Sequence, residues 1–208
     1  MYVGFYFDVD AYNKTAAGSL AGRTNDDDMM AYNDDLDFAY IWDLDDESGG
    51  LTGMAYSAIK FLDSPPAARN LDLNNDGVVD VRQGQKLGLT DWHWFDWYAR
   101  PGVRAVESSS SGGFAGDGQT PIASNAEEVM YRVMSGDTTG LTENQKDWYF
   151  WHSHPGGQQN LHFNSLTNLM ADYPQGLDCT LIASAGPFDL ALGDTANASF
   201  AIIMGDSP

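Results

Sequence analysis

The stretch that decides the fold opens the chain and reads Tyr2-Val3-Gly4-Phe5-Tyr6-Phe7-Asp8-Val9-Asp10. It alternates around bulky aromatic residues and ends in two carboxylates, which is typical of a β-strand. The far end of the chain is similar: residues 180–185 and 196–204 predict a hairpin that turns through Gly186-Pro187-Phe188 and Gly193-Asp194. Aromatic strands at both ends predict a mainly β fold, a β-sandwich of the jelly-roll or immunoglobulin-like kind.

Between these ends, residues 36–42 and 54–62 predict two further strands. Ser124-Asn125-Ala126-Glu127 has the form of a capping box, the side-chain and backbone exchange that starts many helices. It precedes residues 127–135, whose apolar side chains fall on one helical face before Gly136. The sequence therefore predicts a small helical insertion in a β protein.

The overall composition limits the size and the partners of the fold. Of the 208 residues, 43% are hydrophobic and 12% aromatic, which is enough for a substantial core. We expect a single domain over residues 1–208, with a loop and helix insertion at about 105–175. The net charge of −20, from 30 acidic and 10 basic residues, argues against nucleic acid and anionic membranes as partners, because both need a basic face.

The acidic residues are strongly biased toward Asp, with 25 Asp and 5 Glu. Glu favours helices, whereas Asp suits turns, caps and oxygen-rich cation sites. The bias indicates a loop-rich β protein with bound cations. An acidic surface adapted to saline surroundings would give the same bias, and the two explanations are compatible.

The single cysteine, Cys179, lies in a strand-like run and is expected to be a buried structural thiol. No stretch reaches the roughly 18 apolar residues of a membrane span. No signal peptide is visible either, and the strand pattern starts directly after Met1. We expect the sequence to be a mature or excised piece of a longer precursor.

The clearest functional motif is Asp72-Leu-Asn74-Asn-Asp76-Gly77-Val78-Val-Asp80-Val-Arg-Gln83. Calcium binds six to eight oxygens at about 2.4 Å, and a short loop can supply them from alternate residues. Loop positions 1, 3, 5 and 9 carry side-chain oxygens, and position 7 offers a backbone carbonyl. Position 6 is Gly77, where such a loop must turn through a conformation that only glycine adopts at low cost. The predicted calcium ligands are Asp72, Asn74, Asp76, Val78, Asp80 and Gln83.

The last position departs from the pattern, because Gln83 is neutral and cannot give the usual bidentate carboxylate. The affinity should therefore be low unless a remote carboxylate helps. We expect Val79 to pack inward as an apolar anchor. An Asx-rich turn without metal is the alternative. No long amphipathic helix precedes the loop, so the site is expected to be structural rather than a sensor.

A second acidic group is formed by Asp8 and Asp10 together with Asp27 and Asp28. Carboxylates two residues apart at a strand end share one face, and close like charges are costly unless a cation lies between them. A second calcium site and a solvated acidic edge both account for this group.

The aromatic residues are the next outlier: Trp92, Trp94 and Trp97 lie in one run, and Trp151 in another. Alternate indole rings on one strand face could stack on sugars. The alternative, which we favour, is that they fill the core, because Trp often occupies large gaps in β proteins.

The remaining histidine group consists of His152, His154 and His162. In a strand, His152 and His154 would share a face and could bind a transition metal. No Glu stands at a motif spacing and Pro155 ends any regular element, so polar loop histidines are the favoured interpretation. Sequence motifs of serine hydrolases, zinc proteases and phosphate-binding loops are absent.

Several pieces of the chain resemble a loose group of uncharacterised bacterial secreted or cell-surface proteins. They are residues 2–10, the loop at 72–80, Leu87-Gly-Leu-Thr90, residues 184–194 and the closing strand 199–205. The loop also resembles one half of a dockerin, with an EF-hand-type calcium site, but the second half is absent and cohesin binding does not carry over. The resemblance implies export, a β-sandwich and membership of a longer surface polypeptide. It implies no catalytic residues.

The leading hypothesis is a non-catalytic, calcium-stabilised extracellular module with a structural or adhesive role in a surface protein or filament. Its partners would be other domains of the same polypeptide or copies of itself. One alternative is a carbohydrate-binding module that uses exposed Trp residues. A second is a metal-dependent hydrolase that uses the histidine group.

Overall fold

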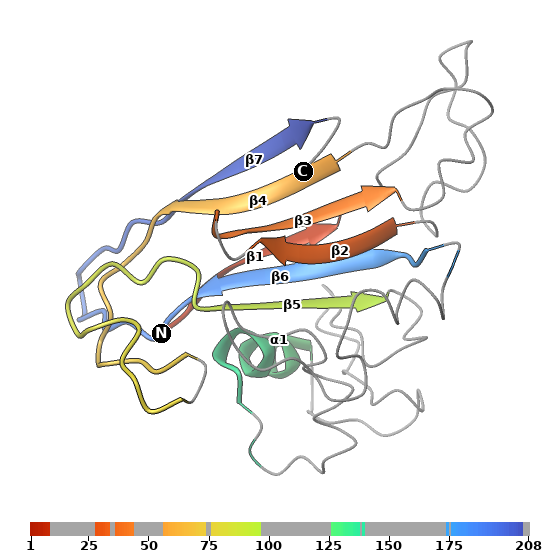
Figure 1. Ribbon diagram of the computed structural model, residues 1–208. Helices are drawn as coiled ribbons and strands as arrows, with labels where there is room; N and C mark the ends of the chain where they lie inside the picture. Colours follow the sequence, from red (N-terminus) through yellow and green to blue (C-terminus); the bar gives the residue numbers. More distant parts are fainter. Residues whose placement is uncertain are drawn as a thin grey trace.

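The computed structural model describes residues 1–8, 28–33, 36–43, 56–73, 76–96, 126–137, 139, 174 and 176–205. These residues form a mainly β protein, with two antiparallel sheets and one helix (Figure 1). The prediction of a mainly β fold is therefore confirmed.

The smaller sheet has three strands in the order β1-β6-β5: β1 (Val3–Asp8), β6 (Cys179–Ala185) and β5 (Asp91–Asp96). All seven positions of β6 are buried, as a central strand requires. The larger sheet has the order β2-β3-β4-β7, and its strands are β2 (Asp28–Asn33), β3 (Phe38–Asp43), β4 (Tyr56–Asp63) and β7 (Ser199–Gly205). Among the described residues, Asp28 of β2 and Leu177, two residues before β6, connect the two sheets by exchanging two backbone hydrogen bonds of 2.8 Å.

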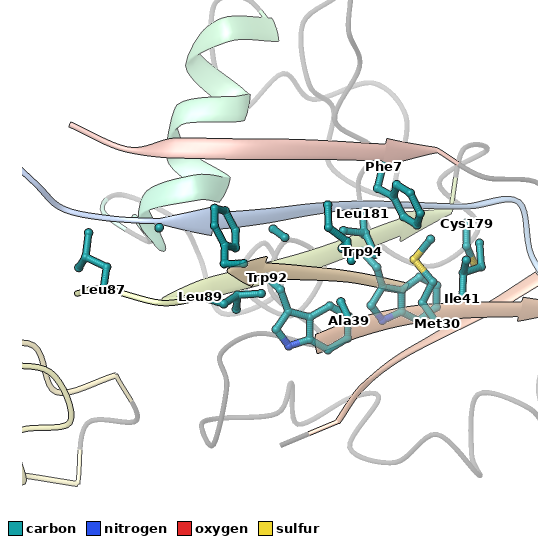
Figure 2. Close-up of a cluster of buried hydrophobic side chains, with 14 of the residues drawn as sticks. Phe7, Met30, Ala39, Ile41, Leu87, Leu89, Trp92, Trp94, Cys179 and Leu181 are labelled. Carbon is teal, nitrogen blue, oxygen red and sulfur yellow. The ribbon is translucent and has the colours of Figure 1, made fainter. Parts of the chain in front are cut away.

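Both sheets contribute to one hydrophobic core. Alternate residues of each strand supply it, because successive side chains of a strand point to opposite faces. Figure 2 shows Trp92 and Trp94 of β5 among side chains from both sheets, with Met30, Ala39 and Ile41 beside them. The core residues on the strands are Phe7, Met29, Met30, Ala39, Ile41, Trp42, Ile59, Phe61, Trp92, Trp94, Cys179, Leu181, Ala183 and Ala185.

The helix α1 (Ala126–Ser135) packs on β5 and β6, on the side of the small sheet away from the core. It ends as the sequence predicts. Gly136 has φ 61°, and the N–H groups of Gly136 and Asp137 donate to the carbonyls of Val133 and Arg132 at 3.3 and 3.0 Å. This is the usual glycine-terminated end of a helix. The rest of the expected insertion lies outside the described residues.

The predicted C-terminal hairpin is wrong, although both of its strands exist. β6 has β1 and β5 on its two sides, so its backbone has no free edge for β7, which pairs with β4 instead. The segment between them is fixed elsewhere. Phe188 exchanges backbone hydrogen bonds with Met1 at 2.9 and 2.6 Å, and Pro187 accepts one from Ala68 at 3.0 Å.

Candidate calcium site

The Asp72–Gln83 loop is closed by a short bridge between Leu71 and Val81, in the segment that connects β4 with β5. The N–H of Leu71 donates to Val81 at 2.8 Å, and the carbonyl of Leu71 accepts from Asp80 at 2.9 Å and from Val81 at 3.2 Å. Leu71 belongs to the core and Val81 packs against it. The base of the loop is therefore anchored while its tip lies in solvent.

Asp72 organises the first half of the loop. Its two carboxylate oxygens accept hydrogen bonds from the backbone N–H groups of Asp76 at 3.2 Å and Gly77 at 2.8 Å. Gly77 has φ 89°, in the left-handed region, and a side chain there would meet no atom within 4 Å. Glycine is thus required by the backbone turn rather than by space.

The other two carboxylates of the motif are held in the same way. Asp76 accepts from the N–H of Val78 at 2.7 Å, and Asp80 accepts from the N–H of Leu73 at 2.7 Å. An ionised carboxylate has about four lone-pair sites, so each of these groups keeps acceptor capacity for a cation. Loop positions 1, 5 and 9 are therefore oriented by the backbone.

The remaining motif residues have mixed outcomes. Val78 is 63% exposed and Val79 is 42% exposed, so the inward anchor expected at Val79 is wrong. Leu71 and Val81 take that role, because they stand at the base of the loop beside the core. Gln83 is exposed, and its N–H donates to the side chain of Asn70 at 2.9 Å. Asn74 lies outside the described residues.

Calcium needs several oxygen ligands that converge on one point. Among the described ranges, no group of three or more Asp, Glu, His or Cys side chains is close enough to hold a metal ion. The carboxylates of Asp72, Asp76 and Asp80 are thus oriented but do not converge in this structure. These hydrogen bonds are the ones that a metal-free Asx turn needs. To bind calcium, the loop would also have to bring the three carboxylates closer together.

The second acidic group is only partly described. Asp8 is exposed at the end of β1, whereas Asp28 is buried at the start of β2. Asp10 and Asp27 lie outside the described residues. The structure adds Asp43, which is buried and stands directly opposite Asp28 in the β2–β3 pairing. Carboxylates that stand directly opposite each other in a sheet reduce its stability. In the sequence, the only sign of this pair is that both residues stand at the ends of apolar strands.

Trp92 and Trp94 are 3% and 0% exposed, and both belong to the core. The ring of Trp92 stacks on Tyr32 of β2, with centroids 5.6 Å apart. The core interpretation is confirmed for these two residues, so they do not offer ring faces to a sugar. Trp97 and Trp151 lie outside the described residues, as do His152, His154 and His162.

A buried acid–imidazole pair was missed by the sequence analysis. Asp91 and His93 lie on the face of β5 opposite Trp92 and Trp94, and Nε2 of His93 is 2.8 Å from Oδ1 of Asp91. Their side chains are 5% and 1% exposed. Nearby, Ser184 donates to the carbonyl of Met134 in α1 at 3.0 Å. In the sequence, the alternation of polar and Trp residues in this run was the sign that Asp91 and His93 share a face. Because both side chains are buried, a substrate cannot reach the imidazole.

Cys179 is buried, as expected, and forms no disulfide, and its thiol lies 3.6 Å from the carbonyl of Asp28. A cleft of about 520 Å³ lies between Pro65, Pro66 and Lys86 on one side and residues 189–197 on the other. Lys86 is already paired with Asp63 at 2.7 Å. The lining is polar and carries both charge signs, without an aromatic ring on which a sugar could stack.

Comparison with protein-family models, with curated proteins and with solved structures finds no match to this chain. Within the described ranges, no helix has the length and apolar character needed to cross a membrane.

Proposed function

We propose that the chain is a non-catalytic structural module of an extracellular or cell-surface protein, stabilised by calcium at the Asp72–Gln83 loop. The observation that carries the proposal is the orientation of three carboxylates by the loop backbone. Asp72, Asp76 and Asp80 stand at loop positions 1, 5 and 9, and each accepts at least one hydrogen bond from a loop N–H.

Calcium would be held by these three carboxylates, with Asn74 and the carbonyl of Val78 as further oxygens. Its chemical contribution would be charge: three like charges in one short loop repel, and a divalent cation compensates them. Because Leu71 and Val81 tie the base of the loop to the core, order in the loop would stabilise the fold.

The neutral residue at position 12, Gln83, makes the proposed site a weak one. Extracellular calcium modules work at dissociation constants of about 10⁻⁴–10⁻³ M, and millimolar calcium outside the cell would fill such a site. The motif resemblance to bacterial secreted and surface proteins supports the same location. The shared core of the two sheets supports a β-sandwich architecture.

The test is thermal unfolding of the whole chain in calcium and in EGTA. With a dissociation constant near 10⁻⁴ M, millimolar calcium should stabilise the fold by about 1.4 kcal/mol. That corresponds to a rise in Tm of roughly 3–6 °C for a chain of this size. Asp76→Ala should lower the Tm in calcium and remove the response to EGTA.

The matched control is Asp189→Ala, which removes an exposed carboxylate outside the loop and should keep the full calcium response. Calorimetric titration of the wild-type chain gives the stoichiometry, expected to be one ion at the loop. A wild-type Tm that is the same in calcium and in EGTA would defeat the proposal and leave the loop as a metal-free Asx turn.

A further inference from the structure

Strand β7 has unusual surroundings for a β-strand. It is the last strand of the four-stranded sheet, where it pairs with β4 and with no other described strand, and Figure 1 shows it at the outer margin of the sheet. Its sequence, Ser-Phe-Ala-Ile-Ile-Met-Gly, contains no charged residue and no proline. Its second backbone edge is therefore available for pairing among the described residues.

The side chains of β7 are exposed on both faces. Phe200 and Ile202 stand opposite the core residues Phe61 and Ile59 of β4, and Ile203 stands opposite Ala58 on the other face. Yet Phe200, Ile202, Ile203 and Met204 are 42%, 52%, 46% and 76% exposed. A strand that is apolar on both faces normally lies inside a sheet.

The small sheet is too narrow to cover this strand. Phe200 touches Phe5 of β1, with ring centroids 4.3 Å apart. β1 is the outer strand of the small sheet. Beyond this contact, Ile202 and Met204 extend along the core side of β7 with more than half of their surface exposed.

The other edge strands of the described part carry charge. Asp8 is exposed at the end of β1, whereas Asp28 of β2 and Asp91 of β5 are buried acidic residues at the starts of their strands. Charged residues and prolines at edges are the usual protection against pairing with another chain, and β7 has neither. A contiguous exposed apolar surface of this kind marks an interaction site.

We infer that β7 pairs with β7 of a second copy of this chain, antiparallel and about a two-fold axis through Ile202. The inference rests on the proposed structural role and names the partner. In this register Ile202 faces its counterpart, Phe200 faces Met204 and Ala201 faces Ile203. Directly opposed residues share a face in an antiparallel pair, so both core sides join into one continuous apolar surface.

Charge restricts the part of the surface at which a second copy can pair. Each chain carries a net charge of −20, so two copies repel over most of their surfaces. Seven consecutive uncharged residues give an edge where no like charges stand opposite each other in the register. At the edge of β1, by contrast, two acidic chains would bring their exposed Asp8 carboxylates together.

The exposed apolar area of β7 determines how strong the dimer is expected to be. At roughly 150–200 Å² for a large side chain, the four exposed fractions amount to about 300–400 Å² in each copy. Edge pairing covers only part of this area, so even with the strand backbone added the total for two copies stays below the roughly 1,000 Å² of a specific interface. The dimer should therefore be weak and dependent on concentration.

The test is sedimentation of the whole chain over a concentration series up to millimolar. The wild type should pass from monomer to dimer, whereas Ile202→Lys should stay monomeric because two ammonium groups would face each other at the axis. Ile202 is 52% exposed, so a lysine stem can lie along the surface without unfolding the strand. Met204→Lys, at a more exposed position, provides a second disrupting variant if Ile202→Lys fails to fold.

Two further experiments test the proposed register directly. Leu192→Lys places the same charge on a fully exposed loop residue outside β7 and should dimerise like the wild type. Ile202→Glu alone should be monomeric, but a mixture of Ile202→Lys and Ile202→Glu should regain the dimer, because only pairing through residue 202 brings the two side chains together. A wild type that stays monomeric, or a mixture that does not associate, would overturn the inference.

The calcium proposal can fail separately. Ile202→Lys should keep the Tm response to calcium, and the wild type should dimerise in EGTA if β7 alone forms the contact. A dimer without a calcium response would overturn only the proposed calcium role. A calcium response without a dimer would overturn only the pairing of β7.

Discussion

The Asp72–Gln83 loop and strand β7 both depend on β4. The chain leaves β4 at Asp63 and runs toward the loop, and β7 pairs with β4 along its length. The loop presents three carboxylates and satisfies them with its own backbone N–H groups. β7 presents apolar side chains and leaves one edge of its backbone available for pairing.

The difference shows two ways in which an exposed segment can be incomplete. The loop lacks compensation for like charges, which a small cation can supply. In the described part of the chain, β7 lacks cover for its apolar surface and partners for its outer backbone edge, and another chain segment can supply both at the same time. The proposed calcium and the proposed second copy therefore answer different physical needs, and they should respond differently to mutation, salt and pH.

The largest expected effect separates backbone strain from calcium binding in the loop. Gly77 and Gly193 have φ values of 89° and 91°, and neither would meet an atom within 4 Å with a side chain. Alanine should therefore cost about 1–2 kcal/mol at either position, because the left-handed conformation is unfavourable for L residues. Gly77→Ala should also weaken calcium binding, whereas Gly193→Ala should leave it unchanged.

Chemical unfolding and calorimetric titration of both variants provide the comparison. Because the two positions have matched strain, a loss of calcium affinity that is equal in the two variants would show that general stability, and not the turn at Gly77, controls the loop. A loss confined to Gly77→Ala would connect the turn to the cation.

The sequence predicts the local features of the fold better than the pairing of its strands. The alternation at residues 2–10 predicts β1, and the runs at 36–42 and 54–62 predict β3 and β4. β2 has the same length as β1 and β3 but was missed because it adjoins a run of acidic residues. The hairpin of β6 with β7 was predicted from their nearness in the sequence, but strand partners depend on which edges remain open after distant segments have paired.

The candidate site shows the same division. The sequence alone identifies the carboxylates, their spacing and the glycine. The structure gives Gly77 the left-handed turn that the motif requires. The inward position of Val79 was wrong, because the loop is anchored by residues outside the motif. The pairing of Asp91 with His93 and the opposition of Asp28 and Asp43 depend on strand faces and registers that no short motif contains.

Salt should change calcium binding at the loop and pairing of β7 in opposite directions. Raising NaCl from about 0.05 to about 0.5 M shortens the screening length from above 10 Å to below 8 Å. Screening should weaken calcium binding at the loop several-fold, because the site attracts the ion through charge. It should strengthen pairing of β7 several-fold, because it reduces repulsion between two acidic chains without affecting the uncharged strand.

Calcium titration and sedimentation at the two salt concentrations measure these changes, with Ile202→Lys as the control that should remain monomeric throughout. Association that weakens as salt rises would indicate a contact made by opposite charges, and would move the interface away from β7.

The smallest effect concerns the junction between the two regions, where Asp63 at the end of β4 stands opposite Ser199, the first residue of β7. A hydrogen bond from Lys86, with a second from the N–H of Ser64, lowers the pKa of the Asp63 carboxyl below its ordinary value. A carboxyl with a lowered pKa in the folded state contributes stability above its unfolded pKa, and this is lost as the pH falls through the folded pKa. Lys86→Met should therefore raise the pKa of Asp63 and reduce stability slightly at neutral pH, with the difference from the wild type disappearing in acid.

Asp137 is the internal reference for that measurement, because its pKa is lowered by hydrogen bonds from Thr139 and has no connection with Lys86. In an NMR titration of the side-chain carboxyls, Lys86→Met should move the Asp63 transition and leave that of Asp137 in place. Exposed ion pairs contribute little to stability, so calcium binding and β7 pairing should both persist in this variant. If either one is lost together with the Lys86–Asp63 pair, then the loop and the strand are coupled through β4 and cannot be treated as separate surfaces.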